Sequence, residues 1–261
     1  MFEARPNDTS LMKKIIASVK ELVSEVNLDF TESGISLQAL DSAHVALVSM
    51  LLFKEGFEPY RCDRGLTLGV NLSSLNRILS CAESDDIITF TCDDTADFMN
   101  LKFESKDGNK VSEYQLRLMD IDQEHLAIPE QQYPCVVSLP SNEFSKICRD
   151  NSNFVQIIVT KGGIKFSTTG ETTKGNVTLK STDSEIISLN VKKPVENEFS
   201  LKHLLQFAKS QALSDHVTLH LAIDLPIMVE YNFEAAGYVK YFLAPKLSDV
   251  GNGEEHEEDE D

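Results

Sequence analysis

Two hydrophobic periodicities alternate along the chain and predict its secondary structure. Apolar residues spaced three and four positions apart predict amphipathic helices at residues 11–26, 72–82, 143–149 and 201–209. Thr9 or Ser10 is expected to cap the first helix. Apolar residues at every second position predict strands, for example at 35–40, 87–90, 99–103, 217–223 and 227–233. The pattern favours an α+β fold in which helices pack on antiparallel sheets.

The same order of elements occurs twice. The turn glycines Gly34 and Gly163 are separated by the same number of residues as Leu72 and Leu201, which begin equivalent predicted helices. Such a period is typical of two copies of one domain. We predict domains at 1–118 and 135–248, an acidic connecting loop at 119–134 and an acidic, disordered tail at 249–261. A connection of this length usually carries function.

Composition excludes several classes of protein. No apolar run approaches the roughly 18 residues that a membrane span needs. The sequence begins without a signal-peptide pattern, which predicts an intracellular protein. The 5 cysteines, an odd number without a Cys-x-x-Cys pair, support neither a disulfide framework nor a zinc ribbon. The net charge of −18 argues against a nucleic-acid ligand until the positions of the charges are considered.

Positive charge is concentrated on the predicted helices, away from their apolar stripes. The basic residues of these helices are Lys13, Lys14, Lys20, Arg77, Lys146, Arg149, Lys202 and Lys209. If both domains place their helices on one side of a sheet, an acidic body acquires a basic face that attracts phosphate. Solvated helix faces are the simpler alternative, although the same segregation on all four helices favours a basic surface. No aromatic residues interleave with these bases, so sequence-independent contact with the duplex backbone is expected.

Several segments carry a family resemblance. They are Met1-Phe2-Glu3-Ala4-Arg5, the stretch 40–45, the run 55–64, Ile128-Pro129-Glu130-Gln131 and Leu243-Ala244-Pro245-Lys246. With them the chain resembles the proliferating cell nuclear antigen family of eukaryotic sliding clamps, from residue 1 to about residue 247. The resemblance implies a nuclear, non-enzymatic processivity factor without a cofactor, a homotrimeric ring that encircles double-stranded DNA. Its implied partners are DNA polymerases, a clamp loader and replication and repair proteins with short clamp-binding peptide motifs.

The resemblance also implies particular site residues. The eight basic residues would face DNA. The partner groove would be formed by Leu40, His44, Val45, Leu126, Ile128, Pro226, Phe242, Ala244 and Pro245. Subunits would join through edge strands at 110–117 and 175–180, with contacts at Val111, Tyr114, Gly175 and Val177. Lys161 matches a lysine that the family modifies with ubiquitin or related proteins. Phe242 and His203 stand where the family commonly has tyrosine.

Two alternatives to a homotrimeric clamp remain at this stage. One is a subunit of a heterotrimeric checkpoint clamp. The other is a hydrolase or transferase that uses its many carboxylates, although the sequence has no phosphate-binding glycine loop. Among the histidines, His216 and His220 would share a strand face, but no third metal ligand lies near them in the sequence, so no metal site is predicted.

Overall fold

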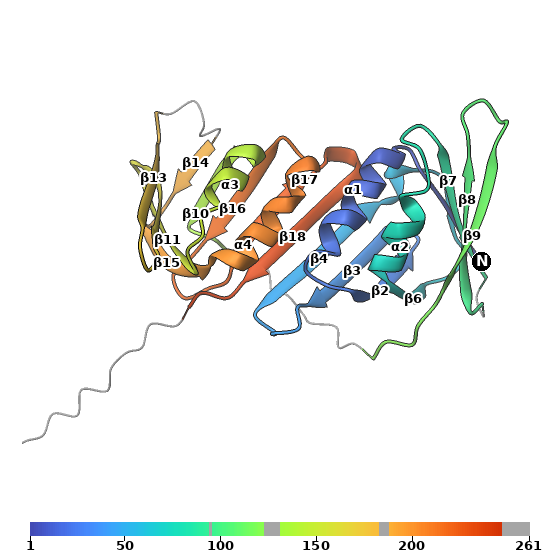
Figure 1. Ribbon diagram of the computed structural model, residues 1–261, viewed down its shortest axis with the longest axis horizontal. Coiled ribbons are helices and arrows are strands. Elements are labelled where there is room, and N and C mark those ends of the chain that lie inside the picture. The colour runs from blue at the N-terminus through green and yellow to red at the C-terminus, as the bar shows by residue number, and fades with distance from the viewer. Residues whose placement is uncertain (94–95, 123–130, 183–187, 247–261) are drawn as a thin grey trace, which may run out of the picture.

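A computed structural model describes residues 1–93, 96–122, 131–182 and 188–246 (Figure 1). The helices are α1 (Thr9–Val19), α2 (Leu72–Leu79), α3 (Ser141–Ile147) and α4 (Leu201–Ala208), with short 3-10 turns η1 (Lys54–Gly56), η2 (Lys209–Ala212) and η3 (Glu234–Ala236). The first-half strands are β1 (Phe2–Pro6), β2 (Glu25–Thr31), β3 (Gly34–Leu40), β4 (Ala46–Phe53), β5 (Phe57–Cys62), β6 (Leu66–Asn71), β7 (Ile87–Cys92), β8 (Phe98–Glu104) and β9 (Val111–Arg117). The second-half strands are β10 (Cys135–Pro140), β11 (Phe154–Thr160), β12 (Gly163–Thr169), β13 (Lys174–Lys180), β14 (Ser188–Val191), β15 (Val195–Ser200), β16 (His216–Leu221), β17 (Ile227–Asn232) and β18 (Gly237–Leu243).

The order of strands in the sheets confirms the duplication. In the first half, the strands run β5-β1-β7-β8-β9 in one sheet and β4-β3-β2-β6 in another. The second half repeats both orders as β14-β10-β16-β17-β18 and β13-β12-β11-β15. Strands β18 and β4 then pair antiparallel and join one sheet from each half into a continuous nine-stranded sheet. The chain is therefore two copies of one α+β unit, fused edge to edge.

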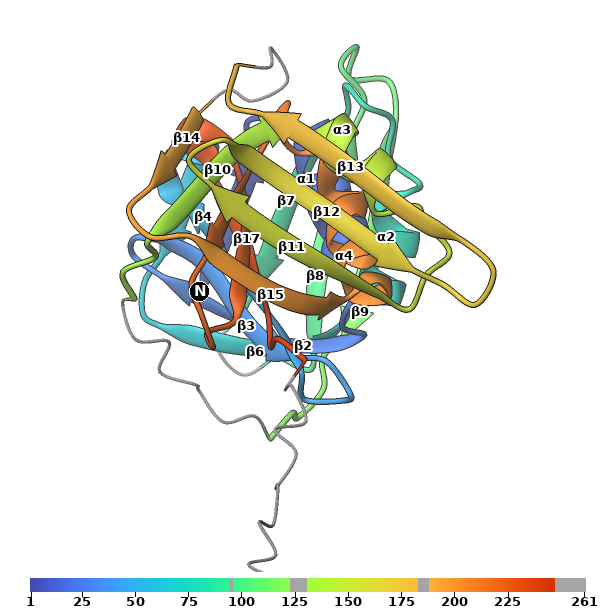
Figure 2. The same ribbon diagram turned by 90° about the vertical axis from the view of Figure 1, so that its left-hand side faces the viewer.

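All four helices cover one face of the nine-stranded sheet, and the two smaller sheets stand at its ends (Figure 1). The view along the molecule shows the four-stranded sheet in front, with the helices to one side of it (Figure 2). The apolar sides of the helices and sheets enclose one continuous cluster of buried residues that crosses the boundary between the halves. At that boundary the ring of Phe207 in α4 stacks on the ring of Tyr241 in β18, with centroids 4.7 Å apart.

The helix ends differ from the sequence prediction. The first helix ends at Val19 instead of Val26, because residues 25–31 alternate between buried and exposed positions and form β2. Its cap is Asp8, whose Oδ1 accepts a hydrogen bond from the Leu11 N–H at 2.9 Å, in place of the predicted Thr9 or Ser10. The second helix ends at Leu79, and the third is shifted two residues toward the N-terminus. The turns at Gly34 and Gly163 are confirmed, and both glycines have a positive φ.

Candidate DNA face, partner groove and subunit edges

Five of the eight basic residues predicted to contact DNA lie within the helices, and the other three follow helix ends: Lys20 is the C-cap of α1, Arg149 lies two residues after α3, and Lys209 is the C-cap of α4 and begins η2. Because each helix buries its apolar side against the sheet, its exposed residues lie on the opposite side, a surface that we call the helix face. Six of the eight are exposed: Lys14, Arg77, Lys146, Arg149, Lys202 and Lys209. The other two are half-buried, and the Lys13 Nζ donates a hydrogen bond to the Ala82 carbonyl at 2.5 Å. The predicted residues therefore share one side of the molecule, as their spacing indicated.

Part of this positive charge is already paired. Glu21 contacts both Lys20 and Lys209, and Glu143 contacts Lys146 within α3 at 2.9 Å. Within the described residues, no ion pair engages Lys14, Arg77, Arg149 or Lys202. Sequence reasoning missed Glu21, because Lys209 lies in the other half of the chain and no local pattern predicts that contact.

On the opposite face of the sheet, apolar side chains form a row across the boundary between the halves; Leu40 and Phe242 are partly exposed, whereas Leu47 and Met228 are buried. Leu40, Leu47, Phe242 and Met228 are register partners on β3, β4, β18 and β17. Side chains alternate along a strand, and Tyr241 packs on α4, so Phe242 points away from the helices. Leu47 and Met228 were not predicted from the sequence; only the strand register brings them into the row.

The other predicted groove residues surround this row. Val45 is 41% exposed, and its carbonyl accepts the Ala244 N–H at 3.0 Å, which extends the β18–β4 pairing toward Pro245. The Pro226 carbonyl accepts a hydrogen bond from the Tyr133 hydroxyl at 3.3 Å. The structure thus brings together Leu40, His44, Val45, Pro226, Phe242, Ala244 and Pro245, whereas Leu126 and Ile128 lie outside the described residues. The predicted tail also lies outside them.

A buried carboxylate shapes the loop at the end of this row. Burial opposes the charge of Asp41, but the N–H groups of Ala46, Val45 and Ala43 donate to its oxygens at 2.8, 2.9 and 3.2 Å and keep its pKa below the ordinary value. His203, in α4, approaches the same carboxylate at 3.4 Å. The loop holds His44 at a φ of 57° and leaves its side chain exposed.

The two strands predicted to join subunits are both sheet edges. β9 closes the five-stranded sheet and β13 closes the four-stranded sheet, and each pairs with one neighbour only among the described strands. Both edges expose apolar side chains, since Val111 is 52% and Val177 is 39% exposed. Tyr114 and Gly175 lie half-buried on the same strands. An exposed, apolar strand edge is a surface that pairs with another chain. Lys161 is exposed in the turn between β11 and β12.

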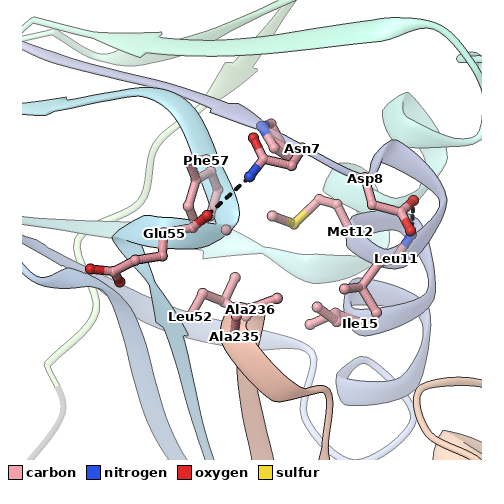
Figure 3. A pocket seen from close by; sticks show the side chains of 12 residues that line it. Asn7, Asp8, Leu11, Met12, Ile15, Leu52, Glu55, Phe57, Ala235 and Ala236 are labelled. Atoms are coloured by element: carbon pink, nitrogen blue, oxygen red, sulfur yellow. Dashed lines mark hydrogen bonds between the residues drawn. The ribbon is translucent and has the colours of Figure 1, made fainter.

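A small hollow lies at the other ends of β4 and β18, between η1, η3 and the start of α1 (Figure 3). Its volume is about 160 Å³, and its walls are mainly apolar, with Leu11, Met12 and Ile15 from α1. The polar groups at its mouth are satisfied by the protein: the Asn7 side-chain amide donates to the Glu55 carbonyl at 3.0 Å, and Asp8 caps α1. Asn7 and Asp8 therefore have structural roles at this hollow.

Comparison with known proteins agrees with the duplicated architecture. A family model described as the proliferating cell nuclear antigen N-terminal domain matches residues 1–125, and one described as its C-terminal domain matches residues 127–246. The chain belongs to the proliferating cell nuclear antigen family. A proliferating cell nuclear antigen of Chaetomium thermophilum is 46% identical over 257 residues, which cover 95% of this chain and 99% of the relative.

Membership of the proliferating cell nuclear antigen family confirms the function that the sequence resemblance implied. The chain is a DNA sliding clamp and processivity factor of replication and repair, and it is not an enzyme. It forms trimers and tethers polymerases and other proteins to DNA. The hydrolase or transferase alternative is thereby excluded. Along the described part of the chain, every helix is too short or too polar to cross a membrane.

Proposed function

We propose that three copies of this chain close into a ring by repeating, between subunits, the strand pairing that joins the two halves of each subunit. The observation that carries this proposal is the equivalence of the edges. By sheet order, β9 is the counterpart of β18, and β13 is the counterpart of β4. Since β18 pairs with β4 inside the chain, β9 of one copy has a matching partner in β13 of the next.

The β18–β4 junction within the chain also supplies the register of the proposed β9–β13 junction between chains. Partner residues across the five-stranded sheet run Ala4, Phe90, Leu101 and Tyr114, and across its counterpart they run Val137, Leu219, Val229 and Tyr241. Tyr114 is therefore the counterpart of Tyr241. Ala39 and Thr168 follow the turn glycines Gly34 and Gly163 at the same spacing, and they pair with Val48 and Gly175, respectively. Gly175 is therefore the counterpart of Val48. Tyr241 faces Val48 inside the chain, so we place Tyr114 opposite Gly175, and Ser112 opposite Val177, between copies.

In this ring the helix face lines the central hole. Lys13, Lys14, Lys20, Arg77, Lys146, Arg149, Lys202 and Lys209 would make diffuse contacts with phosphates of either strand. Contacts of this kind carry no sequence information and allow the ring to move along the duplex. The whole chain has a net charge of −18 even with these eight bases, so its other surfaces repel nucleic acid, which restricts DNA to the hole.

The partner groove lies on the outer side of the same sheet, where it stays accessible when DNA fills the hole. The row of Leu40, Leu47, Phe242 and Met228 provides the floor for apolar anchors of a short helical peptide. The edge of the row at Val45 and Ala244 offers backbone groups for an extended segment. Polymerases and a clamp loader would bind here in the nucleus, and Lys161 would accept ubiquitin or a related modifier.

The decisive experiment combines solution mass with retention on DNA. We expect a homogeneous particle of three times 29.1 kDa with a central hole in electron micrographs. Once loaded, it should remain on closed circular DNA and leave when the circle is cut. A particle that assembles only with other clamp subunits would favour the checkpoint-clamp alternative. Equal retention on circular and cut DNA would contradict topological binding.

A further inference from the structure

Glu21 is an acidic residue among the bases of the helix face, and it contacts a base from each half of the chain. It follows the C-cap of α1, and its carboxylate contacts Lys20 through Oε1 at 2.9 Å and Lys209 through Oε2. Lys209 begins η2, in the second half of the chain, so one carboxylate holds a lysine from each half. The Gln206 side chain donates to the Glu21 backbone carbonyl at 3.0 Å, which fixes the carboxylate beside α4.

The contacts leave Glu21 charged and leave both lysines engaged. Hydrogen bonds from Lys209 and then from Lys20 lower the pKa of Glu21, although burial opposes them. The side chains of Glu21 and Lys20 are about one quarter exposed, which screens their contact less than that of a fully solvated pair. Arg77, Arg149 and Lys202 differ, since no ion pair engages them among the described residues. Glu21 therefore holds two of the eight bases on the helix face, and Glu143 holds a third, Lys146.

We propose that Glu21 is an internal competitor for DNA phosphate, which holds Lys20 and Lys209 back and thereby limits the affinity of the clamp for the duplex. This inference rests on the proposed lining of the hole by the helix face. A phosphate at Lys20 or Lys209 either displaces the Glu21 carboxylate or binds beside it against the repulsion between the two anions, and either cost is subtracted from the free energy of binding. Weak holding suits a ring that is retained by its topology and has to move along DNA.

The first variant to test is Glu21→Gln, which removes the charge and keeps the size and the backbone contact with Gln206. Its matched control is Glu198→Gln, which breaks a lysine pair of similar length on β15, away from the helices, where Glu198 contacts Lys246 at 3.1 Å. Both variants change the net charge equally. A difference between them therefore reports the position of the charge and not its total.

Affinity of the assembled trimer for a short linear duplex should be measured from low to moderate salt. Each additional phosphate contact steepens the slope of log K against log salt by about 0.9. We expect Glu21→Gln to bind about tenfold more tightly at low salt, with a slope steeper by roughly 1 to 2. Its diffusion along stretched DNA should be slower. Glu198→Gln should match the natural protein in all three measurements.

The first part of a second comparison keeps Glu21 and therefore does not depend on how well Glu21→Gln folds. If Glu21 withholds Lys209 from phosphate, Lys209→Gln should weaken duplex binding less than Arg77→Gln does. In the second part, Lys209→Gln should weaken duplex binding more when Glu21 is already replaced by Gln than when Glu21 is present. If Glu21→Gln behaves like Glu198→Gln, and Lys209→Gln weakens binding as much as Arg77→Gln, the competitor role is wrong while the DNA face stands. If Arg77→Gln has no effect either, the proposed DNA face itself fails.

Discussion

The free edges β9 and β13 allow the proposed subunit junction to be tested with one substitution, Val177→Glu. Val177 is 39% exposed on β13, and the register inferred from the internal junction places it opposite Ser112 of the next copy, on the same sheet face as Tyr114. Complete burial of a valine contributes about 1.5–3 kcal/mol, so the exposed part accounts for about 1 kcal/mol at each junction. A carboxylate held in this junction also loses part of its hydration, which costs about 2 kcal/mol more. The total, about 3 kcal/mol, weakens each junction more than a hundredfold.

The assay is sedimentation over a range of concentrations, in which the variant should dissociate to a 29.1 kDa species where the natural protein remains a trimer. Because the side chain is exposed in the single chain, thermal unfolding of the dissociated variant should remain cooperative. Val45→Glu is the matched control, since Val45 is 41% exposed and lies on the partner groove. It should remain trimeric and lose affinity for a clamp-binding peptide. If Val177→Glu has the same trimer affinity as the natural protein, the β9–β13 junction is refuted.

Three further results are expected. Arg77→Glu with Arg149→Glu should leave the trimer intact and shorten retention on circular DNA, with a salt slope shallower by about 1 for each lost phosphate contact in a binding titration. Tyr241→Phe should lower the free energy of unfolding by about 1–3 kcal/mol in urea titrations, because the buried Ser210 hydroxyl loses its 2.7 Å partner; an unchanged midpoint would contradict this. Asp41 has a lowered folded pKa, so its stabilising effect is complete above the ordinary value of about 3.9 and is lost as the pH falls through the folded value. Peptide affinity should fall over that acidic range, and Asp41→Asn should remove this part of the pH dependence.

The secondary structure was largely predictable because it depends on local periodicity. The apolar spacing located all four described helices and placed the turns at Gly34 and Gly163. The first helix was overextended because Val23 and Val26 satisfy helical spacing as well as the alternation of a strand. Pairing with β6 decides between the two for Val26, which is fully buried opposite Val70. That pairing is a long-range contact, which local periodicity does not contain.

The site residues also divide into those that local spacing predicts and those that only long-range contacts bring together. Bases on the helix face follow from helical spacing, since a residue off the apolar stripe is exposed once the helix packs. The groove required either a family resemblance or a strand register, and the resemblance did not supply Leu47 or Met228. Glu21 and Lys209 are far apart in the sequence, and only the packing of α1 against η2 brings them together.

The pairing of β18 with β4 occurs within one molecule, whereas its proposed copy, β9 with β13, occurs between molecules. The covalent tether between the halves gives the first pairing a high effective concentration that dilution cannot lower. The second has no tether, so its occupancy falls as protein becomes scarce. A closed circle of three chains would therefore have three junctions within chains, which dilution does not break, and three dissociable junctions between chains of nearly the same geometry. A protein that opens the circle would act on the junctions between chains.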